Sequence, residues 1–181
     1  MWCYEERYYI MEILSKELFC RILPVTWVQP TITSNGTAYV SELAVSSNFD
    51  DYAWRAFDGN SSTYIYQYGN EYSTTGTTVM YLKKPVKATR MSVTYGSNST
   101  FSGLKTKTVQ VYKNGSWETL YTHTASNGYG DGEPNTTKNY DFTTDGYYQA
   151  YRFVSKTQGS GHWDGCVIKE IKLVGDYEDY V

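Results

Sequence analysis

The sequence predicts an all-β protein, and three observations support that prediction. Only 19% of the residues are charged whereas 17% are aromatic, with twenty Tyr among them, which is not the balance of a typical helical enzyme. From Trp27 onward, short alternating segments are separated by Gly, Asn, Ser and Asp. Asn114-Gly115 lies between alternating apolar residues, and this dipeptide is a strong hairpin signal. At 181 residues the chain is long enough for one domain with a short appendage.

The expected strands are short and number eight. In the third of them Met91, Val93 and Tyr95 alternate with polar residues, as in an antiparallel strand with one buried face. Eight such strands predict an antiparallel, two-sheet jelly-roll β-sandwich. Their expected ranges are Ala38–Val45, Thr77–Leu82, Ala88–Tyr95, Lys107–Lys113, Trp117–Thr124, Lys138–Phe142, Ala150–Lys156 and Val167–Val174.

One helix is expected, from Glu5 to Leu23. Apolar residues recur there at three- and four-residue steps, and Pro24 is expected to end the helix. The helix would either join the protein to a larger assembly or to further copies of itself, or cap one end of the sandwich. The domain boundaries that follow are an N-terminal extension over residues 1–30, a sandwich over 31–175 and a C-terminal tail over 176–181.

Four side chains are expected to have structural roles. Trp54, Phe57 and Trp117 are assigned to the core because of their apolar bulk. Arg152 is assigned to a structural ion pair.

A polar turn follows Phe57 and is rich in oxygen atoms. Asp58, Asn60 and Thr63 offer carboxylate, amide and hydroxyl oxygens, and Gly59 lets the backbone turn tightly. Such a set suits Ca²⁺ better than zinc, which prefers sulfur or nitrogen ligands. The alternative is an Asx turn without a metal.

Three segments carry a family resemblance. AWRAFDGNSSTYIY, from Ala53 to Tyr66, resembles the A-x-D-G-x-x-x-T segment of discoidin-type domains, also called coagulation factor V/VIII type C domains, and of galactose-type carbohydrate-binding modules. VQVYKNGSWETLY, from Val109 to Tyr121, is similar to the mid-domain hairpin of the family. The segment from Tyr151 to Gly175 is similar to its closing strands. The resemblance implies a galactose-binding-like sandwich, a ligand site at one end and a Ca²⁺ site nearby, in which Glu170 matches the acidic residue of the closing strand.

Loops in this sequence combine aromatic residues with Gly, Ser and Asn. A sugar ring offers an apolar face to an aromatic side chain and hydroxyls to polar ones, so this mixture favours a glycan-binding role. For Trp163 the alternative is a core residue, and for His162 an exposed loop residue. The residues expected to bind the sugar are Tyr68, Tyr129, His162 and Trp163, with Asp131 and Lys105 as polar partners.

Catalytic and nucleic-acid functions are disfavoured. The two His residues, His123 and His162, belong to no H-E-x-x-H or G-x-S-x-G arrangement, and no carboxylate spacing pairs an acid with a base. The net charge is −3 and no run of Lys or Arg occurs, which argues against nucleic acid as a partner. No apolar run approaches the roughly twenty residues of a membrane span, so membrane insertion is not expected.

The N-terminal region suggests a setting. The opening MWCYEERYY is not a signal peptide, whereas the segment from Trp27 to Gly36 resembles tail-associated proteins of bacterial viruses. We therefore expect a glycan-binding adhesion module in a virion or another extracellular assembly, with a cell-surface glycan as partner. The alternative is a protein-docking module of a virion or scaffold.

Three Cys residues without C-x-x-C spacing predict buried or free thiols. A covalent link between the N-terminal extension and the sandwich stays open.

Overall fold

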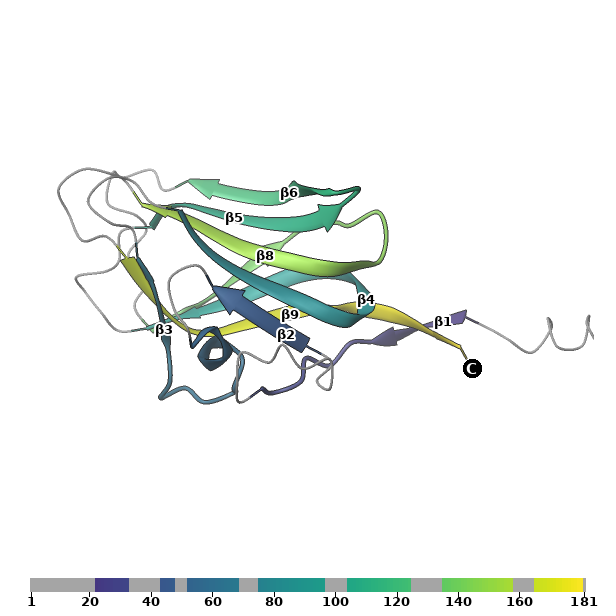
Figure 1. Cartoon of the computed structure of the whole chain (residues 1–181), viewed down its shortest axis with the longest axis horizontal. Helices are drawn as coiled ribbons and strands as arrows, with labels where there is room; N and C mark the ends of the chain where they lie inside the picture. The colour runs from purple at the N-terminus through teal and green to yellow at the C-terminus, as the bar shows by residue number, and fades with distance from the viewer. Residues whose placement is uncertain are drawn as a thin grey trace, which may run out of the picture.

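The computed structural model describes residues 22–32, 43–47, 52–68, 75–96, 104–124, 135–157 and 165–180. Within these ranges the chain forms antiparallel strands and one short 3-10 helix, η1 (Figure 1). The elements are β1 (Ile22–Thr26), β2 (Leu43–Ser47), η1 (Ala53–Ala56), β3 (Ile65–Tyr68), β4 (Thr75–Tyr95), β5 (Leu104–Lys113), β6 (Ser116–Thr124), β7 (Thr137–Asp141), β8 (Tyr148–Thr157) and β9 (Gly165–Tyr180).

Strand β4 belongs to both layers of a β-sandwich. Its residues 78–82 pair with β2 on one edge, and residues 75–81 pair with β8 on the other. Its residues 86–95 pair with β9 and 90–94 with β7. The first layer therefore has the order β2-β4-β8-β5-β6, and the second consists of β7, β4 and β9, with β1 and β3 pairing with the two ends of β9. The predicted antiparallel β-sandwich is confirmed.

The predicted strands each overlap an observed one, but two of them are continuous. Thr77–Leu82 and Ala88–Tyr95 both lie in β4, which runs through Pro85. The pairing of β4 with β8 shifts in register between Tyr81 and Val86. A proline has no N–H to donate, so it is tolerated at such an irregularity. The strand crosses from one layer to the other there, and this explains why the sequence suggested a break.

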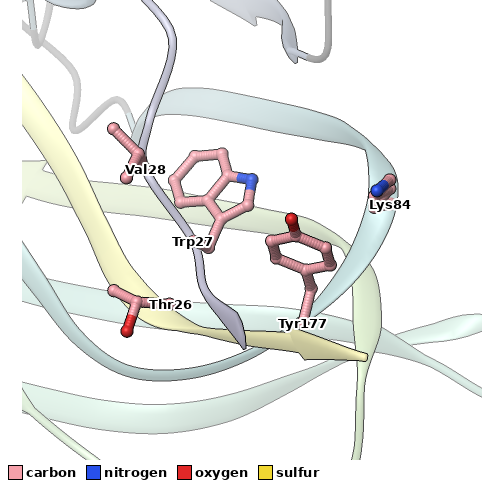
Figure 2. Close-up of a pocket in the computed structure, with 5 residues that line it drawn as sticks. All are labelled: Thr26, Trp27, Val28, Lys84 and Tyr177. Atoms are coloured by element: carbon pink, nitrogen blue, oxygen red, sulfur yellow. The ribbon is translucent and has the colours of Figure 1, made fainter. Parts of the chain in front are cut away.

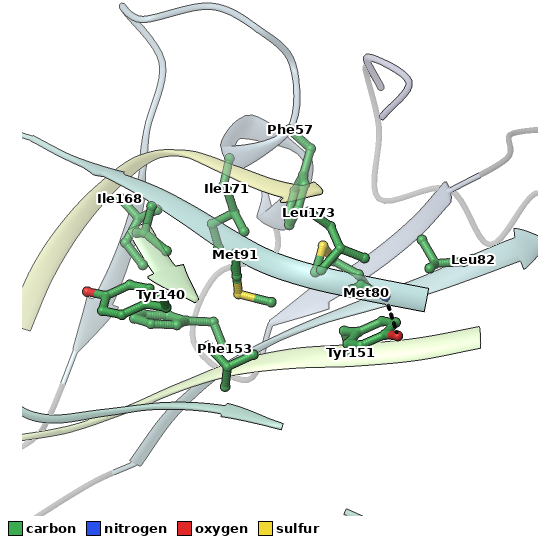
Figure 3. Packing of buried hydrophobic residues seen from close by; sticks show 14 of the residues in the cluster. Phe57, Met80, Leu82, Met91, Tyr140, Tyr151, Phe153, Ile168, Ile171 and Leu173 are labelled. Atoms are coloured by element: carbon green, nitrogen blue, oxygen red, sulfur yellow. Dashed lines mark hydrogen bonds between the residues drawn. The ribbon is translucent and has the colours of Figure 1, made fainter. Parts of the chain in front are cut away.

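The core lies between the inner faces of the two layers (Figure 3). Tyr140 of β7 stacks on Phe153 of β8 with ring centroids 5.8 Å apart, so the rings link the layers directly. Met91 of β4 is fully buried between them. Phe57, which follows η1, is 1% exposed and anchors the turn that comes after it.

The hairpin between β5 and β6 has the predicted turn. Asn114 and Gly115 have φ angles of 52° and 82°, and left-handed φ at both central residues is the requirement of a type I′ turn. The turn joins Lys113 to Ser116 as a cross-strand pair.

The ends of the described chain differ from the sequence-based boundaries. Ile22 and Leu23, expected at the end of a helix, lie in β1, and Pro24 lies inside that strand opposite Glu178. Pairing with β9 overrides the local helical pattern at these positions. Residues 176–180, assigned to a tail, form the end of β9, whereas residues 5–21 of the expected helix lie outside the described residues.

Among the described residues, no helix has the length and apolar character needed to cross a membrane.

Two expected side-chain roles are wrong. Trp117 is partly exposed and lies on the outer face of its layer, because it pairs with the exposed Tyr112. Arg152 forms no ion pair among the described residues; it donates through Nε to Gln110 Oε1 (2.6 Å) and stacks on Trp117. Trp54 is partly buried against the core and Phe57 is fully buried, as predicted.

Candidate functional site

The turn between η1 and β3 gathers oxygen atoms around Thr63. The Thr63 Oγ1 atom lies 2.7 Å from Asp58 Oδ2, 2.8 Å from the carbonyl oxygen of Asn60 and 3.5 Å from that of Arg55. A hydroxyl has one proton to donate, so it serves only one of these three acceptors at a time. The backbone N–H of Thr63 also donates to the Asn60 carbonyl oxygen (3.1 Å), so the hydroxyl is shared between Asp58 and the Arg55 carbonyl as its remaining acceptors.

Local hydrogen bonds explain why this sequence adopts the turn. Asp58 Oδ1 accepts from the Asn60 N–H (2.8 Å), and Asn60 Oδ1 accepts from the Ser62 N–H (3.0 Å). Both are Asx-type bonds, which favour turns. Gly59 has a φ of +68°, a conformation that residues with a Cβ rarely adopt. The turn is thereby fixed by its own side chains and by one glycine.

Glu170 of β9 lies beside this turn. Ile65 of β3 pairs with Ile168 of β9, and this register brings the residues just before β3 close to Glu170. Burial raises the pKa of Glu170 to about 7, and the charge of Asp58 adds to the rise, while Lys172 and the Gly59 N–H oppose it. The structure thus brings together all four residues that the sequence suggested as metal ligands.

The donor set fits a hard cation. It consists of two carboxylates, Asp58 and Glu170, one hydroxyl and the carbonyl oxygens of Arg55 and Asn60, and oxygen ligands of mixed charge are what Ca²⁺ takes in proteins. No group of three or more His, Cys, Asp or Glu that could hold a metal occurs in the described part of the chain. A cation at this turn would therefore be bound by two carboxylates and otherwise by the neutral hydroxyl and carbonyl oxygens. The Asx-type bonds of the alternative interpretation are present too, and the two interpretations are compatible.

The residue types in the sequence do not indicate which backbone groups point into this site. The carbonyl of Arg55 faces Thr63, and the backbone of Gly59 lowers the pKa of Glu170. Every residue carries such groups, so only the geometry of the turn reveals which ones point inward.

The expected sugar-binding residues are only partly located. Tyr68 ends β3 opposite Gly165, and Lys105 lies near the start of β5, but their side chains lie outside the described residues. These strand ends lie at one end of the sandwich, on the left in Figure 1. The other expected residues are outside the described ranges altogether: Tyr129, Asp131, His162 and Trp163.

A small pocket lies at the other end of the sandwich, beside β1 (Figure 2). Its volume is about 140 Å³ and its lining includes Trp27 and Tyr177. The Lys84 Nζ atom lies 4.5 Å from the centroid of the Tyr177 ring and 3.2 Å from Asp179 Oδ2. None of the residues expected to bind sugar or metal lines this pocket.

Solved structures of similar fold agree with this architecture. The third family 32 carbohydrate-binding module of a family 31 glycoside hydrolase from Clostridium perfringens is 20% identical, with a TM-score of 0.58 over 74% of this chain and 91% of that chain. The family 32 module of C. perfringens NanJ, solved with galactose, is 18% identical, with a TM-score of 0.55 over 76% and 94%. An F5/8 type C domain from Bacteroides fragilis is 20% identical, with a TM-score of 0.54 over 75% and 92%.

Comparisons by sequence alone give no match. No protein-family model matches the chain, and no curated protein is similar to it. The structural likeness nevertheless shows the fold, which is the galactose-binding-like, discoidin-type β-sandwich that the three sequence segments suggested.

Proposed function

We propose that this protein is a non-catalytic carbohydrate-binding module whose turn after η1 is stabilised by Ca²⁺. The observation that carries the proposal is the oxygen cluster around Thr63, joined to Glu170 in a fold whose solved examples include a galactose complex. Proteins on one fold have many functions, so the proposal rests on this site as well as on the fold.

A bound Ca²⁺ would be held by Asp58, Thr63, Glu170 and the backbone carbonyls of Arg55 and Asn60. It would supply positive charge beside two carboxylates, one of which is partly buried. Asp58 and Glu170 repel each other when both are ionised, and a divalent cation removes that cost. The result would be a more rigid junction between η1, β3 and β9.

The sugar would bind at the end of the sandwich where β3 and β5 adjoin the loops. Aromatic side chains supply a flat apolar surface for the C–H face of a pyranose, and amide, carboxylate and ammonium groups bind its hydroxyls. The proposed contacts are those expected from the sequence: Tyr68, Lys105, Tyr129, Asp131, His162 and Trp163.

The proposed partner is a cell-surface glycan, and galactose-type sugars are the first to examine because the NanJ module was solved with galactose. The proposed setting is the adhesion part of a bacteriophage tail or another extracellular surface-binding assembly. Support for that setting is the resemblance of the segment from Trp27 to Gly36 to tail-associated proteins.

A glycan array probed with and without a chelator tests the proposal. We expect binding to galactose-type glycans that the chelator weakens, and a similar loss in D58N, which keeps the Asx-turn acceptor but removes the charge. D141N is the matched control because Asp141 is an exposed carboxylate in an ion pair with Arg90 on another strand pair. Absence of retained glycan at high protein loading would contradict the proposal.

The alternative, a protein-docking module, makes a different prediction. It requires stable oligomers or complexes that form without sugar, which light scattering detects. Stable oligomers together with a blank glycan array would favour that alternative.

A further inference from the structure

The outer face of the layer β4-β8-β5-β6 carries a group of side chains that the loop-end site does not use. We define the outer platform as Tyr81, Gln110, Tyr112, Trp117 and Arg152. Tyr81 and Tyr112 are 49% and 45% exposed, so both aromatic side chains are available to a ligand. The four strands lie side by side at the top of Figure 1.

Contacts across three strands hold the platform in place. The Arg152 Cζ atom lies 4.3 Å from the centroid of the Trp117 ring, and the Tyr112 and Trp117 centroids are 5.2 Å apart. Arg152 Nε donates to Gln110 Oε1 (2.6 Å), and Gln110 in turn donates to Thr119 Oγ1 (3.0 Å). The guanidinium is therefore already oriented before any ligand arrives.

No carboxylate in the described part of the chain neutralises the charge of Arg152. Among the described residues neither terminal nitrogen of its guanidinium makes a hydrogen bond, and no carboxylate pairs with it. Three other cations on the strands do have carboxylate partners: Lys84 with Asp179, Arg90 with Asp141, and Lys113 with Asp145.

The described strands of this layer carry few acidic residues. In β4, β8 and β5 buried residues alternate with residues that point outward. No residue of β6 is buried, and its one acid, Glu118, pairs with the inward-facing Val111 and lies 3.8 Å from Lys113. In the described parts of β4 (residues 75–82), β8, β5 and β6, the outward-facing residues include Lys156 and many Thr but no Asp or Glu. A chain of net charge −3 thus presents a cationic, hydroxyl-rich surface here.

We propose that the outer platform is a second binding surface, for an anionic polysaccharide that bears carboxylates, such as a uronate chain. The fork of a guanidinium matches a carboxylate with two parallel hydrogen bonds. Tyr81, which pairs with Ala150 two residues from Arg152, and Tyr112 offer rings to the sugar faces. The proposal goes beyond the loop-end sugar site and does not depend on it.

The surrounding residues favour a glycan over an acidic protein. Stable protein interfaces need a core of closely packed apolar side chains, whereas Thr is the commonest of the outward-facing residues of these strands. Hydroxyl and amide groups suit the many hydroxyls of a sugar chain.

Isothermal titration calorimetry with short oligogalacturonide and oligomannuronide probes tests the proposal, with their methyl esters as uncharged controls. We expect at least one acid form to bind, the esters to bind at least about tenfold more weakly, and the affinity to fall with added salt. R152Q should weaken binding by about tenfold or more. R152K, which keeps the charge but not the fork, should lie between R152Q and the wild type.

The controls separate a specific surface from general attraction. R90Q removes one positive charge from another face and should leave the affinity within about twofold, because exposed charges far from the ligand are screened. Y81A, at an exposed position, tests the platform independently if R152Q fails to fold. D58N should not change uronate binding, so failure of the loop-end site and failure of this one are distinguishable.

Three results would overturn the proposal. These are the absence of binding by both acid probes, equal binding of acids and esters, and an equal loss in R90Q and R152Q.

Discussion

Asp58 and Glu170 come from distant parts of the sequence, yet the charge of Asp58 helps to raise the pKa of Glu170. The pairing of Ile65 with Ile168 brings the residues just before β3 close to Glu170. Burial and the charge of Asp58 both oppose ionisation of Glu170, the positive charge of Lys172 favours it, and a bound cation would favour it further. This relationship is the physical basis for proposing a cation there.

Removal of the Tyr151 hydroxyl should destabilise the sandwich. Tyr151 is fully buried, donates to the Val86 carbonyl (2.6 Å) and accepts from the Ala88 N–H (3.3 Å). Y151F leaves these backbone groups without that partner, so we expect the free energy of unfolding to fall by about 1–3 kcal/mol. Urea unfolding measures the change. Y112F is the control at an exposed position, and an equal effect in both variants would contradict the assigned role.

Gly175 is expected to tolerate no side chain. A Cβ added there would lie far inside van der Waals contact with the backbone oxygen of Lys87 and 2.7 Å from the Cα of Ala88. Backbone atoms of a paired strand cannot move aside cheaply, so G175A should lower the free energy of unfolding by about 1–3 kcal/mol. G146A is the control, because its Cβ would come no closer than 3.4 Å to the atoms of Tyr148. Equal stability of the two variants would show that β4 and β9 are not paired as described.

Asp145 gives a pH-dependent contribution to stability. Hydrogen bonds from Lys113 and Tyr148 lower the pKa of Asp145 from 3.8 to about 2. Because its folded-state pKa is depressed, its contribution is fully present above the unfolded value and is lost as the pH falls through the folded value. The difference in unfolding free energy between wild type and D145N should therefore shrink between about pH 4 and pH 2. A difference that stays constant over this range would contradict the assignment.

Much of the fold followed from residue patterns. The alternation of Met91, Val93 and Tyr95 identified a strand with one buried face, and Asn114-Gly115 identified the hairpin between β5 and β6, because both signals are local. The continuity of β4 through Pro85 was not predictable from local preference. It depends on two layers that share one strand.

The candidate site was predictable in its side chains but not in its backbone. Carboxylate, amide and hydroxyl residues within one short turn indicated Asp58, Asn60 and Thr63, and family resemblance added Glu170. The outer platform was missed because Trp117 has the bulk of a core residue. Its outward direction follows from its pairing with Tyr112, which periodicity in β6 alone does not reveal.

The most direct test of the central claim is the change in melting temperature on titration with Ca²⁺ after chelator treatment. A ligand at a hundredfold excess over its Kd stabilises by about 2.7 kcal/mol, which corresponds to a rise of roughly 5–10 °C for a domain of this size. We predict this rise for the wild-type protein and D141N, and little or none for D58N and E170Q. No rise in the wild type, or an equal rise in all four proteins, would contradict a calcium site formed by the turn after η1 and Glu170.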